Sequence, residues 1–194
     1  METNWDVIVV GGGGSGLAAA LSAAQQGGRV LLLEKRPQMG GTTGIAVGSF
    51  TAAGISLQRQ SGIEDHFQQH VEDVAQFAEP GIESRNNDSL RNFFLSQAAD
   101  TFDWLQELGL SFVGPHPEPP NRVARMHNVV PGAKAYIAAF QLALQKTTAR
   151  QINGALVNQL LLEEGRVVGV EVDINKVRHA FTASRGVILA AGDY

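Results

Sequence analysis

The segment from Asp6 to Arg36 reads DVIVVGGGGSGLAAALSAAQQGGRVLLLEKR and decides the fold of this chain. Its β-branched opening run, Val7 to Val10, predicts a strand that is buried on both faces. A glycine turn follows, and then an alanine- and leucine-rich helical segment that stops at Gly27-Gly28. A second apolar run, Val30 to Leu33, ends on Glu34. This order of strand, glycine turn, helix, strand and acid predicts a dinucleotide-binding βαβ unit rather than a merely structural turn.

The glycines of the motif Gly11-x-Gly13-x-x-Gly16 each have a mechanical role in such a unit. Gly11 permits the tight turn off the first strand, Gly13 lets a pyrophosphate approach the backbone, and Gly16 lets the helix lie close to the sheet. The pyrophosphate would lie at the N-terminus of the helix that starts near Ser15, where unpaired N–H groups and the helix dipole favour negative charge. Glu34 would accept hydrogen bonds from the ribose hydroxyls of the adenosine.

Composition excludes several classes of function. The chain has 194 residues, 44% of them hydrophobic, so it can form one domain, or one domain and part of another, around a real core. A net charge of −4 without a basic cluster argues against nucleic acid as a partner. The absence of cysteine excludes disulfides, Cys-ligated iron–sulfur clusters and c-type haem attachment within the chain.

Localisation and metal binding are predicted by similar exclusions. No apolar run approaches the length of a membrane span, and residues 1–6 lack the basic start and apolar core of a signal peptide. We therefore expect a cytoplasmic protein with no membrane span. The histidines His66, His70, His116 and His179 show no metal-ligand spacing, so no metal site is expected.

The residues after Glu34 bear on the identity of the dinucleotide. They read KRPQMGGTTGIAVGSFTAAG, and their five glycines and weak periodicity predict an extended loop with exposed backbone. In a typical NAD-dependent dehydrogenase, the second strand would lead promptly into another helix and a third parallel strand. An NAD-dependent enzyme therefore remains an alternative, but this loop speaks against it.

The middle of the chain predicts helices and loops. An apolar stripe in residues 55–86 predicts a helix that is ended by Pro80-Gly81, and Asn87 offers an N-cap for a longer helix that Gly109 stops. Residues 114–122 are proline-rich and predict a stiff loop, and residues 122–133 precede another amphipathic helix. We interpret His127 in that segment as a loop histidine that contacts solvent or backbone.

From Ala155 the apolar period changes to two. Turns at residues 163–165 and 175–176 then predict an antiparallel three-stranded meander that ends near Ala183. The run from Gly186 to Gly192 predicts a separate, buried final strand that ends in a turn of small residues. The predicted fold class is therefore α/β, with a parallel Rossmann-like sheet, a helical insert and an antiparallel β-meander.

Several of these motifs resemble one enzyme family. VVGGGGSGLAAA (9–20), LLEK (32–35) and GGTT (40–43), followed by AVGS (46–49), resemble the start of the FAD-dependent oxidoreductases. This group includes fumarate reductase, the succinate dehydrogenase flavoprotein, L-aspartate oxidase and the 3-ketosteroid dehydrogenases. ALVNQLLLEEGRVVGVEV (155–172) resembles the meander of the family, and the final strand resembles a family strand that ends in Ala-Thr-Gly, with Ala191 in place of the threonine.

The resemblance implies FAD as the cofactor and hydride transfer between the flavin and a C–C bond of a small organic acid or steroid-like substrate. It also implies non-covalent FAD, because Thr42 stands where relatives with covalent flavin carry a histidine. Arg125 and His127 would lie near the flavin, although no residue of this chain is predicted as a catalytic acid or base. The implied cofactor-binding residues are Gly11, Gly13, Ser15, Gly16, Glu34, Lys35, Gly41, Thr42, Thr43, Ala46, Gly48, Val157, Ala191 and Gly192.

Members of the family are much longer, so we expect residues 1–194 to be the N-terminal portion of a FAD-binding domain whose capping or substrate domain is absent from this chain. A second polypeptide would then complete the site, and the isolated chain would not turn over substrate by itself. A truncated nucleotide-binding module without catalysis remains the other alternative.

Overall fold

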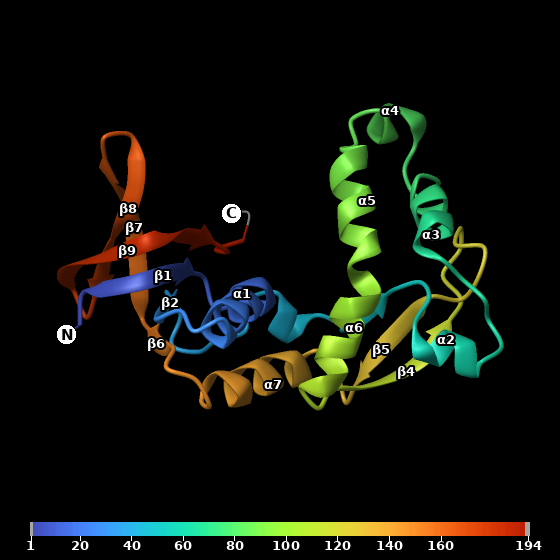
Figure 1. Cartoon of the computed structure of the whole chain (residues 1–194), viewed down its shortest axis with the longest axis horizontal. Helices are drawn as coiled ribbons and strands as arrows, with labels where there is room; N and C mark the ends of the chain where they lie inside the picture. The colour runs from blue at the N-terminus through green and yellow to red at the C-terminus, as the bar shows by residue number, and fades with distance from the viewer. Residues whose placement is uncertain (1, 193–194) are drawn as a thin grey trace. The chain divides into compact units, whose positions relative to one another are not determined.

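The structure is a computed structural model that describes residues 2–192, so Met1, Asp193 and Tyr194 lie outside the described residues. The chain divides into two compact units (Figure 1). The first unit combines residues 1–46 with residues 133–194, and the second unit is the intervening segment 47–132. A single FAD-binding domain over residues 1–194 stays a prediction about how these two units work together.

The first unit contains a six-stranded sheet with the strand order β6-β2-β1-β9-β8-β7. Strands β6, β2, β1 and β9 pair in parallel with one another. On its other side β9 pairs with β8, and β9, β8 and β7 form an antiparallel meander. This mixed sheet confirms the predicted fold class. The strands are β1 (Asn4–Val10), β2 (Val30–Glu34), β6 (Arg150–Asn153), β7 (Ala155–Glu163), β8 (Arg166–Ile174) and β9 (Val177–Leu189).

The βαβ unit forms as its sequence predicts. Residues 7–10 of β1 pair in parallel with residues 30–33 of β2, and every residue of β2 is buried. Helix α1 (Gly14–Gln25) connects the two strands and ends just before Gly27, whose φ of +81° lies in the region that favours glycine. The glycine motif therefore lies at the carboxyl end of β1, between this strand and α1.

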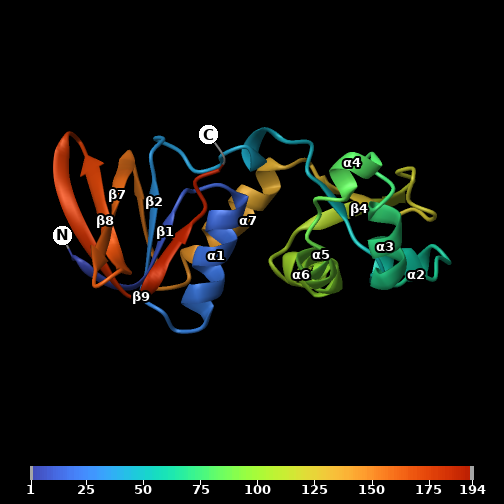
Figure 2. The same cartoon turned by 90° about the horizontal axis from the view of Figure 1, so that it is seen from above.

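A third parallel strand, β6, was not predicted. It follows helix α7 (Lys134–Leu144), which packs beside α1 (Figure 2), and it pairs with β2. The second unit is therefore inserted between β2 and the helix that leads to the next strand of the sheet. Because β6 contributes only the four residues RQIN, it lacks the apolar run that identifies a buried parallel strand.

The last two predicted strands are one strand. β9 runs through residues 177–189 without a break, pairing with β8 in its first part and with β1 in its second. The expectation of a buried final strand was also wrong, because Ile188 is 38% exposed and Leu189 is 63% exposed. A run of apolar residues reports how a strand could be buried, but not whether another element covers it.

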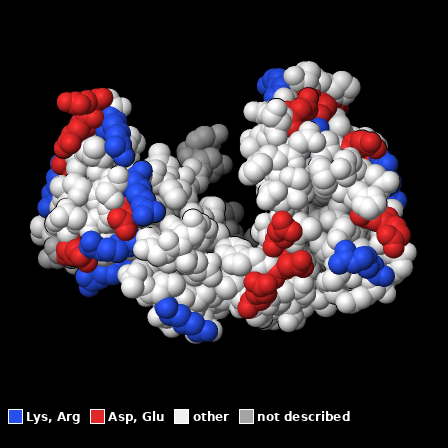
Figure 3. Space-filling view, in the orientation of Figure 1, with Lys and Arg blue, Asp and Glu red and all other residues white. Residues whose placement is uncertain are grey.

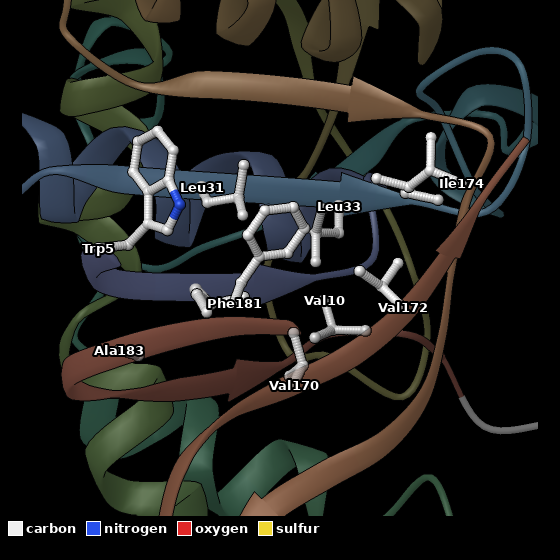
Figure 4. Packing of buried hydrophobic residues seen from close by; sticks show 11 residues of the cluster. Trp5, Val10, Leu31, Leu33, Val170, Val172, Ile174, Phe181 and Ala183 are labelled. Atoms are coloured by element: carbon white, nitrogen blue, oxygen red, sulfur yellow. The ribbon is translucent and has the colours of Figure 1, made fainter. Parts of the chain in front are cut away.

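The core of the first unit lies on the face of the sheet where the meander closes over β1 and β2. Trp5 of β1, Leu31 of β2 and Phe181 of β9 are almost fully buried there (Figure 4). Val170 and Val172 of β8 complete the contact between the parallel and antiparallel parts. Burying such side chains stabilises the sheet by about 1.5–3 kcal/mol each, so the βαβ unit and the meander form one folding core.

The second unit contains a three-stranded antiparallel sheet, of order β3-β5-β4, which the sequence interpretation missed. The segments predicted as loops contribute to it: β3 lies in the glycine-rich stretch, β5 lies in residues 122–133, and β4 reaches into the proline-rich stretch. The elements are β3 (Ser49–Thr51), α2 (Ser56–Gln60), α3 (Phe67–Val74), α4 (Pro80–Glu83), α5 (Asp88–Ser96), α6 (Ala98–Glu107), β4 (Ser111–His116) and β5 (Met126–Val130).

The helices of this unit differ from the prediction in two ways. Pro80 begins α4 instead of ending a helix, and the long helix predicted after Asn87 is divided at Gln97 into α5 and α6. The predicted cap is confirmed, because the Asn87 side chain accepts a hydrogen bond from Leu90 N–H at 3.0 Å. Phe94 of α5 is 66% exposed.

The core of the second unit is aromatic. Phe102 of α6 is fully buried, with ring centroids 5.7 Å from Phe50 of β3 and 4.5 Å from Phe112 of β4. The His127 ring of β5 lies 5.3 Å from Phe102. These contacts hold α6 against the sheet, with tilted rings as aromatic pairs prefer.

Acidic and basic side chains are interspersed over the face of the molecule shown in Figure 3. Within residues 2–192, no helix is both long enough and apolar enough to cross a membrane.

Candidate functional site: the glycine turn of the first unit

The glycine turn between β1 and α1 is a meeting point of segments that are far apart in the sequence. Gly11 N–H donates to Leu33 O of β2 at 2.8 Å, and Gly40 N–H donates to Gly12 O at 2.8 Å. Gly13 and Gly40 form an isolated parallel bridge. The strand end of β2 and the GGTT loop are thereby fixed against the turn by backbone hydrogen bonds.

Gly11 and Gly16 are explained by the packing of the protein itself. A Cβ on Gly11 would collide with the backbone of Ala190 and Ala191, and its φ of +107° is one that side chains rarely adopt. A Cβ on Gly16 would collide with the carbonyl oxygen of Gly11. These contacts place Ala191 against the turn and hold α1 close to the sheet, as the sequence predicts.

Gly13 has no such explanation within the fold. Its backbone is ordinary, with φ −75° and ψ −178°, and a Cβ there would meet only the Cα of Gly41, at 3.9 Å. The protein alone would therefore tolerate a side chain at this position. A glycine whose missing Cβ leaves open space beside a helix N-terminus fits a cradle that a bound group fills, and this is the feature that a pyrophosphate requires.

The N-terminus of α1 is electrostatically open. The N-cap residue of α1 is Gly13, which has no side chain to cap the helix, and the first turn of α1 contains no acidic residue. The Thr43 hydroxyl accepts a hydrogen bond from Gly14 N–H at 3.2 Å, whereas the next N–H groups in the first turn have no partner within the helix. Ser15 is exposed in this turn. The positive end of the helix dipole is thus available to an anion.

Glu34 is buried, with 6% of its surface exposed, and it holds the turn. Its Oε2 accepts from Gly12 N–H at 2.6 Å, and its Oε1 accepts from Arg36 N–H at 2.8 Å. Each carboxylate oxygen has a second lone pair, so binding of a ribose hydroxyl, which stays a prediction, is compatible with this role.

Glu34→Gln is expected to weaken both the turn and the dinucleotide site. An amide is neutral and offers one oxygen where the carboxylate offers two, so one of the two backbone N–H donors loses its acceptor and the other keeps only an uncharged one. Since hydrogen bonds to charged groups contribute about 1.5–3 kcal/mol, the free energy of unfolding should fall by about this amount, and FAD affinity should fall roughly tenfold. Chemical denaturation and calorimetric titration measure the two effects. Glu163→Gln, at an exposed position, is the control; equal stability of both variants would contradict the role of Glu34.

The GGTT loop turns back on the helix N-terminus. Gly41 has φ +52°, and a Cβ there would lie 3.0 Å from Gly13 Cα. Thr42 is exposed and precedes the short 3₁₀ helix η1 (Thr43–Ile45). Lys35 and Ala46 are also exposed. The structure therefore brings Gly41 and Thr43 to the glycine turn. The cofactor contacts of these two residues, and those of Lys35, Thr42 and Ala46, stay predictions.

The remaining predicted positions lie on other elements. Val157 is half-buried on β7, next to a register shift between Val157 and Gln159 that interrupts the pairing with β8. Gly192 is exposed, with φ +91°, after the end of β9. Gly48 belongs to the second unit, where its carbonyl accepts from Val129 N–H at 3.3 Å.

Two glycines of the turn were missed in the sequence. Gly12 donates to Glu34, and a Cβ there would collide with Met39. Gly14 N–H donates to the Thr43 hydroxyl, and a Cβ on Gly14 would crowd the side chain of Thr43. The uninterrupted run of four glycines was the available signal, because a motif with two free positions does not by itself demand glycine in them.

Buried polar residues of the second unit

Arg125, which the resemblance to the family implies to lie near the flavin, belongs to the interior of the second unit. It is completely buried and forms ion pairs with Asp65 and Asp73, both at 2.6 Å, and both carboxylates are also buried. Burial alone would raise the pKa of Asp73, but N–H donors from Arg122 and Arg125 outweigh it and lower the pKa to about 2. Arg125 is therefore part of a structural ion-pair network.

His127 is likewise not the solvent-contacting loop residue that was predicted. It lies on β5 with no exposed surface, and neither ring nitrogen has a partner with hydrogen-bond geometry. Burial lowers the pKa of His127, although the nearby carbonyl groups of Phe50 and Arg125 act in the opposite direction. Since neither carbonyl completes a hydrogen bond, burial prevails, and the ring is neutral at pH 7 and packs as an apolar group.

His70, on α3, makes the second unit sensitive to acid. It is 2% exposed, and burial together with the charge of Arg125 lowers its pKa from 6.5 to about 4, against the opposing charges of Asp65 and Asp73. In the unfolded chain His70 is protonated below about pH 6.5, whereas in the folded protein it stays neutral down to about pH 4. The free energy of unfolding should therefore be highest above pH 6.5 with respect to His70 and should fall by roughly 3 kcal/mol between pH 6.5 and pH 4.

Urea denaturation between pH 7 and pH 4 tests this expectation. His70→Gln removes the titrating group, so its stability should fall less steeply over this window than that of the unmodified protein. His127 and the aspartates titrate in both proteins and cancel in the comparison. Parallel pH profiles for the two proteins would show that His70 is not the source of the acid sensitivity.

Comparison with known proteins

The sequence matches the family model described as "FAD binding domain" over residues 6–194. The chain belongs to this family, and FAD is the dinucleotide that its fold binds. The NAD-dependent alternative is thereby set aside.

The curated relatives of the chain are fumarate reductases and an NADH:fumarate oxidoreductase. A probable fumarate reductase, Ifc3, of Shewanella frigidimarina (strain NCIMB 400) is 30% identical over 170 residues, which are 85% of this chain and 28% of that protein. The open conformation of a flavocytochrome c3 fumarate reductase is 28% identical, with a TM-score of 0.91, over all of this chain and 34% of the other.

A third similarity concerns the fold alone. The 3-ketosteroid-Δ4-(5α)-dehydrogenase of Rhodococcus jostii RHA1 is 24% identical, with a TM-score of 0.87, over all of this chain and 47% of the other. The chain spans less than a third of the curated relatives it matches. What it shares with them is the FAD-binding part.

Proposed function

We propose that this chain is the FAD-binding part of an oxidoreductase of the fumarate reductase type, acting on a C–C bond of a small organic acid or of a steroid-like molecule. The observation that carries the proposal is the open position at Gly13 beside an uncapped helix N-terminus. This cradle fits a pyrophosphate, and the match to the FAD-binding family and the similarity to a probable fumarate reductase support the proposal.

Different residues of the first unit would bind different parts of FAD. The first turn of α1, with Gly13 and Ser15, would donate N–H groups to the pyrophosphate, and Glu34 would accept from the ribose. Val157, Ala191 and Gly192 would contact the adenosine end, and the loop from Gly41 to Ala46 would support the flavin. Bound flavin supplies hydride transfer, whereas the protein supplies position and electrostatics.

The FAD should be non-covalent, because Thr42 stands where covalently linked relatives carry histidine and the chain has no cysteine. Acid precipitation of the FAD-loaded protein should release all of the flavin into the supernatant. Flavin fluorescence that stays with the washed precipitate would contradict this assignment.

Substrate conversion is proposed to need a further polypeptide. The two best candidates for proton transfer, Arg125 and His127, are fully buried, and Arg125 is held by two carboxylates. No residue of the described part of the chain is therefore proposed as the catalytic acid or base. A cytoplasmic location is part of the same proposal.

Anaerobic reoxidation of the dithionite-reduced, FAD-loaded chain tests the proposed function. We expect reversible reduction of the bound flavin, and reoxidation by fumarate or a 3-ketosteroid only slightly faster than that of free reduced FAD. Co-expression with the remaining two-thirds of a fumarate reductase should accelerate reoxidation by the matching substrate. A chain that binds FAD but cannot be reduced reversibly would instead be a non-catalytic nucleotide-binding module.

A further inference from the structure

The second unit contains a cavity of about 290 Å³ between α3 and α5. It lies entirely within residues 51–121 and is therefore independent of the glycine turn in the first unit. Its volume is close to the lower end of the range for small-molecule sites, about 300–1,000 Å³. Its apolar lining, called here the apolar wall, consists of Val74, Phe77, Phe94 and Leu95, and its polar lining, the polar wall, consists of Thr51, His70, Arg91, Glu118 and Asn121.

The apolar wall leaves large side chains in contact with water. Phe77 is 49% exposed and Phe94 is 66% exposed, although both border a cavity next to the buried Leu95. Covering apolar surface stabilises a complex by about 25 cal/mol per Å². A flat, apolar molecule that covers these two rings would therefore gain from burial and from contact with their faces or edges.

The polar wall offers acceptors rather than free cations. Glu118 Oε2 accepts from Thr51 Oγ1 at 3.1 Å and from Asn121 Nδ2 at 3.3 Å, while no donor among residues 2–192 reaches its Oε1. Arg91 is held by both oxygens of Glu83, at 2.6 and 2.8 Å, so its charge is balanced. An anionic ligand would thus meet an uncompensated carboxylate and no free positive charge.

His70 supplies an independent sign that the polar wall is incomplete. It borders the cavity, is 2% exposed, and its Nδ1 has no hydrogen-bond partner. A buried polar atom without a partner costs about 1–3 kcal/mol. Because this nitrogen has almost no accessible surface, a donating ligand group in the cavity would find its acceptor at Glu118 Oε1 instead.

We infer that this cavity binds a small, uncharged ring compound that carries a hydroxyl group. The ring would lie against Phe77 and Phe94, and the hydroxyl would donate a hydrogen bond to Glu118 Oε1. The site would reject carboxylates, which distinguishes it from a site for organic acids.

Titration of the isotope-labelled chain with three matched compounds tests the inference. Para-ethylphenol carries the hydroxyl, para-ethylanisole has a methoxy group that cannot donate, and para-ethylbenzoate is an anion. We expect para-ethylphenol to shift the backbone NMR signals of residues 70–77 and 91–95, the anisole to bind at least tenfold more weakly, and the benzoate not to bind. Equal binding of all three, or no binding of para-ethylphenol up to its solubility limit, would overturn the inference.

Two adjacent phenylalanines provide a matched pair of variants. Phe94 lines the cavity, whereas Phe93 is equally exposed, at 67%, and does not line it. Phe94→Ala should weaken para-ethylphenol binding at least tenfold, and Phe93→Ala should leave it unchanged. Because both side chains are mostly exposed, both variants should fold. Equal effects of the two substitutions would show that the compound binds nonspecifically to the surface of α5 and would overturn the assignment.

Discussion

Gly13→Val is expected to abolish most FAD binding while leaving the protein folded. The new side chain would occupy the open space beside the N-terminus of α1 and displace the pyrophosphate from the helix N–H groups. Loss of two or three charge-assisted hydrogen bonds, each contributing about 1.5–3 kcal/mol, amounts to at least a 100-fold rise in Kd, since about 1.4 kcal/mol corresponds to tenfold. Calorimetric titration measures the change.

The stability of the FAD-free variant separates this effect from misfolding. A Cβ at Gly13 meets only Gly41 Cα, at 3.9 Å, so the denaturation midpoint should stay close to that of the unmodified protein. Gly81→Ala is the control, because a Cβ there meets no atom within 4 Å and lies in the second unit. Unchanged FAD affinity in Gly13→Val would show that the glycine motif is a structural turn.

The second large effect concerns stability rather than binding. Arg125→Ala should lower the free energy of unfolding of the second unit by about 3–5 kcal/mol, because it leaves Asp65 buried without a cation and Asp73 paired only with the partly exposed Arg122. Hydrogen bonds from Gln58 and Arg122 remain, but neither replaces a buried guanidinium. Urea denaturation, followed by backbone NMR signals of the second unit, measures the loss.

Arg178→Ala is the matched control for this substitution. Arg178 also pairs with two carboxylates, those of Glu171 and Asp173, but it is 61% exposed. Exposed ion pairs contribute about 0–1 kcal/mol, so its loss should be small. Similar destabilisation by both substitutions would mean that burial of the network around Arg125 does not determine its importance.

The first unit was predictable where local chemistry dictates geometry. Two buried strands, a glycine turn and a helix follow from residues 6–36, and the turns at Glu164 and Asn175 have the positive φ values that such hairpins require. The strand β6 was not predictable, because its four residues carry little apolar signal and its pairing with β2 spans more than a hundred residues of sequence.

The second unit was predicted less well because its polar core depends on tertiary contacts. Arg125 lies between proline-rich and glycine-containing segments, which predict a loop, and only Asp65 and Asp73, some fifty to sixty residues earlier, make its burial possible. The same holds for His127, whose burial depends on Phe102. Sequence periodicity identifies apolar faces, but it does not report which polar groups will find partners.

The candidate site was predicted in part. Gly11 and Gly16 follow from the motif, and the structure supplies the backbone contacts that require them. The capping of Gly14 by Thr43 and the hold of Glu34 on Gly12 were not predicted, because a motif states which residues recur and not which atoms meet.

Calorimetric titration of the purified, flavin-free chain with FAD and separately with NAD tests the central claim most directly. The cradle at Gly13, the GGTT loop and the family match predict a one-to-one complex with FAD and much weaker binding of NAD. Tighter binding of NAD than of FAD, or no binding of FAD by the folded chain, would contradict the account.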